Sequence, residues 1–165
     1  MLNYGSFAQD QFDEYNINDL ANANIEDYQK YASSKPTVQN NQTVQGSGYL
    51  GGSLTLVNNI TLSMAFRNIS QDTVAHISYT DHYGNEHTYV IESSDNELNS
   101  GACVINVKNL AVADGRTLVT CKIMRGDEVV VTVTDSMESY AARKPGVLVA
   151  SELMKFADSS YNYFH

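Results

Sequence analysis

Apolar and polar residues alternate with a period of two through the middle of the chain, from about Tyr49 onward. The clearest segment is 60–67, whose residues Ile60, Leu62, Met64 and Phe66 are expected to face a core. Six further segments share the pattern, and strands are predicted at 52–57, 74–80, 87–92, 102–107, 118–124 and 129–134. Turn-forming residues separate them. About seven short strands of this kind predict an antiparallel β-sandwich of immunoglobulin-like size.

The two ends of the chain carry a helical pattern instead, and they resemble each other. Residues 2–12 align without gaps on residues 154–164, and large apolar or aromatic residues match at the first, third and last positions. A short motif that returns once, after about 150 residues, is too widely spaced for a solenoid. We interpret the N-terminal copy as the closing helix of a preceding repeat unit, packed on this module.

These patterns divide the chain into four segments of one compact module. We expect an N-terminal helical segment at 1–32, a polar linker at 33–48, the β-sandwich at 49–134 and C-terminal helices at 135–165. In the last segment a short helix is predicted at 137–143, ending before Pro145. A longer helix follows, with a stripe that suits burial against a sheet edge or another helix. The stripe consists of Val147, Ala150, Met154, Ala157, Tyr161 and Phe164.

Two cysteines, Cys103 and Cys121, alternate with apolar residues in consecutive predicted strands. If these strands pair as a hairpin around residues 111–115, Cys103 lies roughly opposite Cys121. In that arrangement, the two cysteines could form a disulfide in an oxidising compartment. The alternative is two buried thiols that fill core volume. Neither cysteine has a CxxC context or an obvious histidine partner, so no catalytic thiol is expected.

Composition narrows the classes of partner and the location. The net charge is −9 and no basic run occurs, so nucleic acid and anionic membrane surfaces are disfavoured. Only 18% of the residues are charged, while Asn, Ser, Thr and Tyr are abundant, which suggests an extracellular module. No apolar stretch approaches the length of a membrane span. If the parent protein is exported, its signal is expected upstream of this fragment.

The predicted hairpin at 78–91 holds the most suggestive candidate site. With Gly84-Asn85 as a two-residue turn, His82 would lie opposite His87, and this pair could begin a zinc or copper site. No third ligand is evident on that face, so no metal and no cofactor are expected. The other hypothesis is sugar binding, with tyrosine rings stacking on pyranose faces. The candidate ligand-binding residues are Tyr79, Asp81, His82, Tyr83, His87 and Tyr89.

A glycoside-acting enzyme is the third hypothesis, and the sequence favours it least. Glycoside hydrolysis needs two carboxyl groups that face each other across a cleft. The acids Asp95, Glu97, Asp114, Asp127 and Glu128 fall in predicted loops, where we expect them to be solvated. The sequence has no nucleophile elbow, Gly-rich phosphate loop or metal-binding helix motif. We therefore expect no catalytic residues and no enzyme.

Five motifs, taken together, resemble a module found near the C-termini of large secreted or cell-surface proteins of Gram-positive gut anaerobes. They lie at residues 2–22, 78–84, 110–120, 135–143 and 156–163. The resemblance implies an exported, multi-domain parent protein that is located outside the cell or on its wall. It also implies that the neighbouring domains of the same polypeptide are partners of this module. It brings no catalytic residue. We expect the chain to be a non-catalytic structural or adhesin-like module. The alternative is a carbohydrate-binding module that uses the hairpin tyrosines. A glycan, or a host or cell-surface protein, is the expected external partner.

Overall fold

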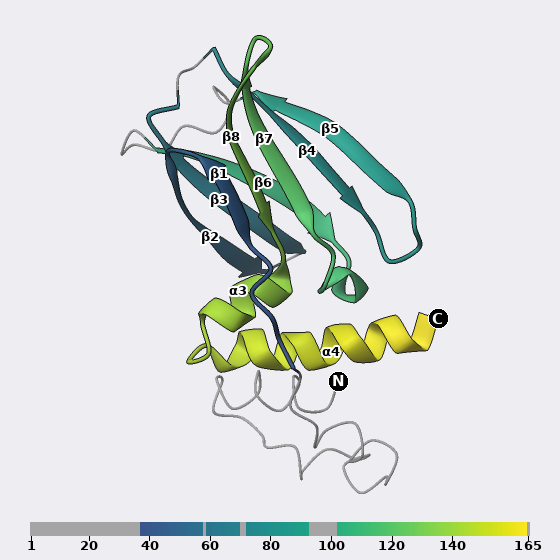
Figure 1. Cartoon of the computed structure of the whole chain (residues 1–165). Helices are drawn as coiled ribbons and strands as arrows, with labels where there is room; N and C mark the ends of the chain where they lie inside the picture. The colour runs from purple at the N-terminus through teal and green to yellow at the C-terminus, as the bar shows by residue number, and fades with distance from the viewer. Residues whose placement is uncertain (1–36, 58, 70–71, 93–101, 165) are drawn as a thin grey trace, which may run out of the picture.

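The computed structural model describes residues 37–57, 59–69, 72–92 and 102–164 (Figure 1). The helical segment predicted at 1–32, with its motif copy at 2–12, lies outside these residues. The strands are β1 (Thr43–Gly46), β2 (Tyr49–Leu56), β3 (Ile60–Arg67), β4 (Val74–Thr80), β5 (Glu86–Glu92), β6 (Ala102–Leu110), β7 (Val119–Arg125) and β8 (Glu128–Asp135). A short 3-10 helix, η3 (Val112–Asp114), precedes β7, and two helices, α3 (Met137–Arg143) and α4 (Leu148–Phe164), follow β8.

The strands form two antiparallel sheets that face each other (Figure 1). One sheet has five strands in the order β1-β8-β7-β4-β5, and the other has three in the order β2-β3-β6. Each of the seven predicted strands has a counterpart in these sheets. The prediction of a mainly β, sandwich-like fold is confirmed.

The core lies between the sheets, where the alternating apolar residues meet. Leu62, Met64 and Phe66 of β3 are fully buried, as their spacing predicts. β3 is the central strand of its sheet, and the opposite face of this strand is also covered: Ser63 is buried and its hydroxyl bonds to the amide oxygen of Asn106 at 2.6 Å. A buried hydroxyl needs such a partner, because an unpaired polar group inside a protein is costly.

Part of the predicted polar linker is a strand. Residues 43–46 form β1, which pairs with the end of β8 from Thr43↔Thr134 to Gly46↔Val131. All four residues of β1 are exposed. An edge strand with no buried face carries no apolar alternation, so the period of two could not reveal it.

The hairpin predicted between residues 102–107 and 118–124 is wrong. β6 pairs with β3, whereas β7 pairs with β4 and β8, so η3 carries the chain from one sheet to the other. Cys103 and Cys121 therefore lie in different sheets, and both are buried free thiols. Burial, with a smaller contribution from Cys103, raises the pKa of Cys121 to about 12. The Cys121 thiol is neutral at ordinary pH.

Both described helices lie at one end of the sandwich (Figure 1). α3 begins at Ser136, whose hydroxyl accepts a hydrogen bond from the backbone N–H of Ser139 at 3.0 Å. In α4 the centre of the predicted stripe is buried, including Met154 and Ala157, but Tyr161 near its end is 45% exposed. None of the helices in the described part of the chain is long and apolar enough to cross a bilayer.

A glycine after η3 permits close contact between η3 and α4. A Cβ atom added to Gly115 would lie 2.5 Å from the Cβ of Ala157 and 3.2 Å from the methyl carbon of Met154. Only a residue without a side chain fits this approach. The backbone after η3 therefore packs directly against α4.

Candidate functional site

The β4–β5 hairpin has a different register from the predicted one. Tyr79 pairs with His87 and Thr80 with Glu86, so His82 and His87 do not face each other. The connection at residues 81–85 is organised by Asp81, whose Oδ1 accepts the backbone N–H groups of Tyr83 and Asn85 at 2.9 and 2.8 Å. An aspartate that bonds to the backbone two residues ahead is a known turn former, and it replaces the predicted Gly84-Asn85 turn.

The three hairpin tyrosines do not form one binding surface. Tyr79 stacks on His87 with ring centroids 4.6 Å apart, and both Tyr79 and Tyr89 are half-buried against the core. Burial raises the pKa of both hydroxyls, that of Tyr89 to about 12. Tyr83 is 61% exposed, and the centroid of its ring lies 3.9 Å from that of the His82 ring. Of the three rings, only that of Tyr83 is largely open to solvent.

The two histidines bind separate carboxylates. His87 Nε2 lies 2.9 Å from Asp81 Oδ2, and this contact is the main reason why the pKa of Asp81 is held far below its usual value. His82 lies next to η3, with its backbone N–H and its ring Nδ1 each 2.8 Å from Asp114 Oδ1. In the described residues, no group of three or more His, Cys, Asp or Glu side chains could hold a metal ion.

Asp114 is a structural residue, and the expectation that it is solvated in a loop is wrong. Its side chain is 4% exposed, and that of His82 is 8% exposed. The second carboxylate oxygen of Asp114 accepts the backbone N–H of Ala111 at 3.0 Å. Asp114 therefore fastens the 81–85 connection to η3. Asp127 and Glu128 are exposed as expected, while Asp95 and Glu97 lie outside the described residues.

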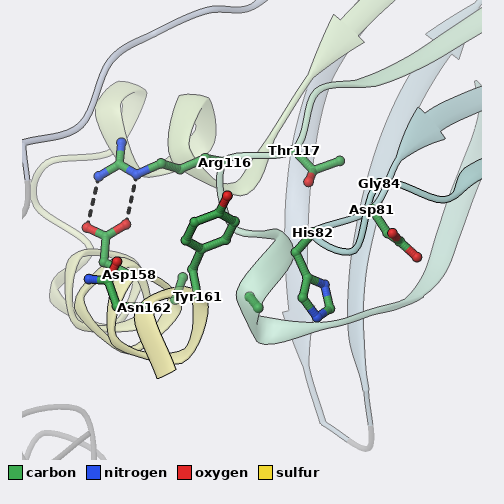
Figure 2. A pocket seen from close by; sticks show the side chains of 10 residues that line it. Asp81, His82, Gly84, Arg116, Thr117, Asp158, Tyr161 and Asn162 are labelled. Atoms are coloured by element: carbon green, nitrogen blue, oxygen red, sulfur yellow. Dashed lines mark hydrogen bonds and ion pairs between the residues drawn. The ribbon is translucent and has the colours of Figure 1, made fainter. Parts of the chain in front are cut away.

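Arg116 connects three parts of the chain that are far apart in sequence. Its Nε and Nη2 donate to the two carboxylate oxygens of Asp158 on α4 at 2.8 and 2.9 Å (Figure 2). Its Nη1 donates to Oε1 of Glu138 on α3, and Nη2 also donates to the backbone carbonyl of Thr37 at 3.1 Å. The bond to Asp158 raises the pKa of Arg116, so the guanidinium stays charged.

Glu138 extends this contact to the segment before β1. Its side chain is 5% exposed. Its two oxygens accept the backbone N–H of Gln39 at 3.2 Å and the side-chain amide of Asn41 at 3.3 Å. The hydroxyl of Ser139 accepts the backbone N–H of Asn41 at 2.9 Å. The segment leading into β1 is thus held along α3 by side chains of that helix.

A second ion pair with a buried carboxylate also involves α3. Asp135, at the end of β8, has no exposed surface and is paired with Arg143 at the end of α3. Its carboxylate also accepts hydrogen bonds from Gln42 and Tyr49. Burial, then the neighbouring Asp135, raises the pKa of the Tyr49 hydroxyl well above its usual value. Gly52 leaves room for this carboxylate, since a Cβ there would lie 2.8 Å from Asp135 Oδ2.

Neither ion pair was among the candidate site residues from the sequence. A signal was present: Asp135, Glu138 and Arg143 share one short motif with apolar neighbours, and Asp114 and Arg116 share another. Charged residues are rarely buried without a partner, so opposite charges within one motif indicate pairing, as Asp135 and Arg143 show. Asp114 and Arg116 do not pair with each other, since Asp114 binds His82. The pairing of Arg116 with Asp158, 42 residues away, could not be read from local spacing.

A surface pocket of about 710 Å³ lies between the 81–85 connection, the segment after η3 and the second half of α4. Its lining includes Asp81, His82, Arg116, Thr117, Asp158 and Tyr161. Figure 2 shows Tyr161 between the Arg116–Asp158 pair and His82. The pocket therefore combines one tyrosine ring with polar side chains from three parts of the chain.

Comparison of this chain with family models, with curated proteins and with solved structures finds no match. No residue role can therefore be transferred from another protein.

Proposed function

We propose that this chain is a non-catalytic structural or adhesin-like module of an exported, multi-domain surface protein. The buried charged residues of its motifs bond to partners within the chain, as Asp135 does with Arg143 and Glu138 does with Arg116. A catalytic acid or base must instead reach a ligand. These buried charged residues stabilise the fold through their partners within the chain, which supports a structural role.

The observation that carries the proposal is that Arg116 binds both Thr37 and Asp158. The start of the described chain and helix α4 are therefore attached at the same end of the sandwich. The turn between β7 and β8 lies at the opposite end (Figure 1). In this proposal, the loops at the far end and the sheet faces are the surfaces offered to a partner.

We also propose an immunoglobulin-like fold, an extracellular location and a surface partner for this module. An immunoglobulin-like sandwich is supported by the size of the domain and by its short antiparallel strands. An extracellular or wall-associated location is supported by the low share of charged residues, 18%. The resemblance to modules of secreted surface proteins points to the same location, and it makes a glycan or a host or cell-surface protein the partner to look for.

Unfolding in optical tweezers, with handles on the two chain ends, tests the structural role. We expect α4 and the sandwich to unfold in one cooperative step, because Arg116 ties the helix to the sheets' end. Arg116→Gln should release α4 in a separate step at lower force. Arg125→Gln is the matched control, since its pair with Asp72 is exposed and longer, at 3.8 Å.

Two results would contradict the proposal. One is release of α4 from the wild-type chain at low force while the sandwich stays folded, because such an attachment could not carry a neighbouring domain. The other is release of reducing ends from a polysaccharide by the wild-type protein, with loss of that activity in Asp158→Asn.

A further inference from the structure

We propose that the pocket beside α4 binds a neutral, hydroxyl-rich ligand, namely a segment of an uncharged glycan. The structural role proposed above does not require this pocket. The pocket also differs from the hairpin surface considered from the sequence, because its aromatic ring comes from α4.

Tyr161 supplies an apolar surface in the pocket. Its side chain is 45% exposed although the centre of the same helix is buried. The CH face of a pyranose can pack against such a ring, and the hydroxyl groups around the sugar edge then need polar partners. Figure 2 shows Arg116 and Asp158 on one side of Tyr161 and His82 on the other. Asn162, also exposed and in the lining, adds an amide that can both donate and accept.

The charges favour an uncharged ligand over an acidic one. Among the described residues that line the pocket, the one permanently charged cation is Arg116, which is bonded to the carboxylates of Asp158 and Glu138 and to a backbone carbonyl. It is therefore not available for a two-point grip on a ligand carboxylate. Asp81 and Asp158 add negative charge to the lining, and the whole chain carries −9. A uronic or sialic acid would be repelled, while a neutral sugar would not.

Two polar side chains of the pocket, Arg116 and His82, are held in place before a ligand arrives. Arg116 is fixed by its bonds to α3, α4 and Thr37, and His82 is fixed by Asp114. Side chains that are already ordered lose little conformational entropy on binding. Weak, hydroxyl-directed contacts can then contribute to affinity instead of being offset by ordering.

The hairpin tyrosines are poorer candidates for the same task. Tyr79 and Tyr89 pack against the core, and Tyr83, though exposed, is not in the pocket lining. This contrast provides a matched pair of exposed tyrosines: Tyr161 inside the pocket, 45% exposed, and Tyr83 outside it, 61% exposed.

The test is a glycan array that carries neutral oligosaccharides together with uronic- and sialic-acid-bearing ones, probed with the full chain. We expect retention on neutral glycans only. For the best neutral glycan, Tyr161→Ala should weaken binding about tenfold, as expected for loss of one aromatic contact. Asn162→Ala should weaken it less, and Tyr83→Ala should leave it unchanged. Tyr161→Phe, which keeps the ring, should bind like the wild type.

Amide chemical-shift mapping of the wild-type chain with that glycan keeps the proposal testable even if a variant folds poorly. The shifts should cluster at Gly84, Thr117 and Asn162, which line the pocket. The proposal is overturned by no retention on any neutral glycan, by stronger retention of acidic glycans, by equal binding of Tyr161→Ala, or by shifts elsewhere. None of these outcomes affects the cooperative unfolding expected for the structural role, so the two proposals fail separately.

Discussion

Arg143 and Asp135 form a two-point ion pair, with Nη1 2.9 Å from Oδ1 and Nη2 2.8 Å from Oδ2. The carboxylate is fully buried at the end of β8, and the guanidinium belongs to the last residue of α3. The pair therefore joins the helix to the five-stranded sheet. Gln42 and Tyr49 bond to the same carboxylate, so the segment before β1 and strand β2 depend on it too.

We expect Arg143→Met to lower the free energy of unfolding by about 3 kcal/mol, because it leaves the buried Asp135 carboxylate without its cation. Urea denaturation followed by circular dichroism measures this loss. The double variant with Asp135→Asn should be less unstable than Arg143→Met alone, since the unpaired charge is removed. Arg125→Met is the control, and equal losses in Arg125→Met and Arg143→Met would contradict the assignment.

We expect Gly115→Ala to destabilise the chain by about 1–3 kcal/mol, the usual cost of adding a group to a filled core. The added Cβ would lie 2.5 Å from the Cβ of Ala157. Ala157→Gly in the same chain should recover part of the loss, because it removes the clash but costs about 1 kcal/mol of helix propensity within α4. Gly146→Ala is a suitable control, because a Cβ there meets nothing within 4 Å. If the two single variants melt at the same temperature, η3 and α4 are not in close contact.

We expect Asp114→Ala to speed hydrogen exchange at the backbone amides of His82 and Ala111, which lose their shared acceptor. The loss of stability should be about 1–3 kcal/mol, the cost of leaving buried polar groups unpaired. Exchange measured by NMR reports both amides. Asp127→Ala, in the exposed β7–β8 turn, should leave their exchange unchanged. Unchanged exchange in Asp114→Ala would mean that another group holds the 81–85 connection.

Alkaline pH should destabilise the fold partly through Cys121. Burial raises the pKa of this thiol from 9.0 to about 12, so its contribution to stability is complete below pH 9.0 and is lost as the pH rises toward 12. Urea midpoints measured across this range should fall less steeply for Cys121→Ser, which does not ionise there. In the folded chain at neutral pH both cysteines should resist iodoacetamide. Rapid labelling without denaturant would show that the thiols are accessible.

Local pattern predicts seven of the strands, β2 to β8, but neither the exposed edge strand β1 nor the partner of each strand. The alternation in 60–67 and 74–80 predicts β3 and β4, since a half-buried strand must repeat every two residues. The pairing of β6 with β3, and of β7 with β4 and β8, depends on residues far away in the sequence. Adjacent strands were therefore assumed to pair, which put Cys103 and Cys121 in one hairpin. Their positions in opposite sheets follow from the topology alone.

The candidate site also depends on contacts between residues far apart in the sequence, which local pattern does not reveal. Asp81 and His82 were predicted as ligand-binding residues and do line the pocket, but Tyr161 and Arg116 were not considered. Tyr161 continues the apolar stripe of α4, so the sequence assigned it to the core. Only the arrangement of α4 relative to the sandwich leaves this ring partly open. The Gly84-Asn85 pair predicts a two-residue turn, whereas Asp81 closes a longer connection, and the observed register differs for this reason.

The contacts of Arg116 also set the order in which the chain can fold during synthesis. Its carboxylate partners are 22 and 42 residues downstream. Strand β1 can pair only after β8 has been made, since Thr43 pairs with Thr134. A ribosome-bound chain that stops short of α4 lacks the last of these contacts. The module should therefore reach its native state in a late step, after its final helix has been translated.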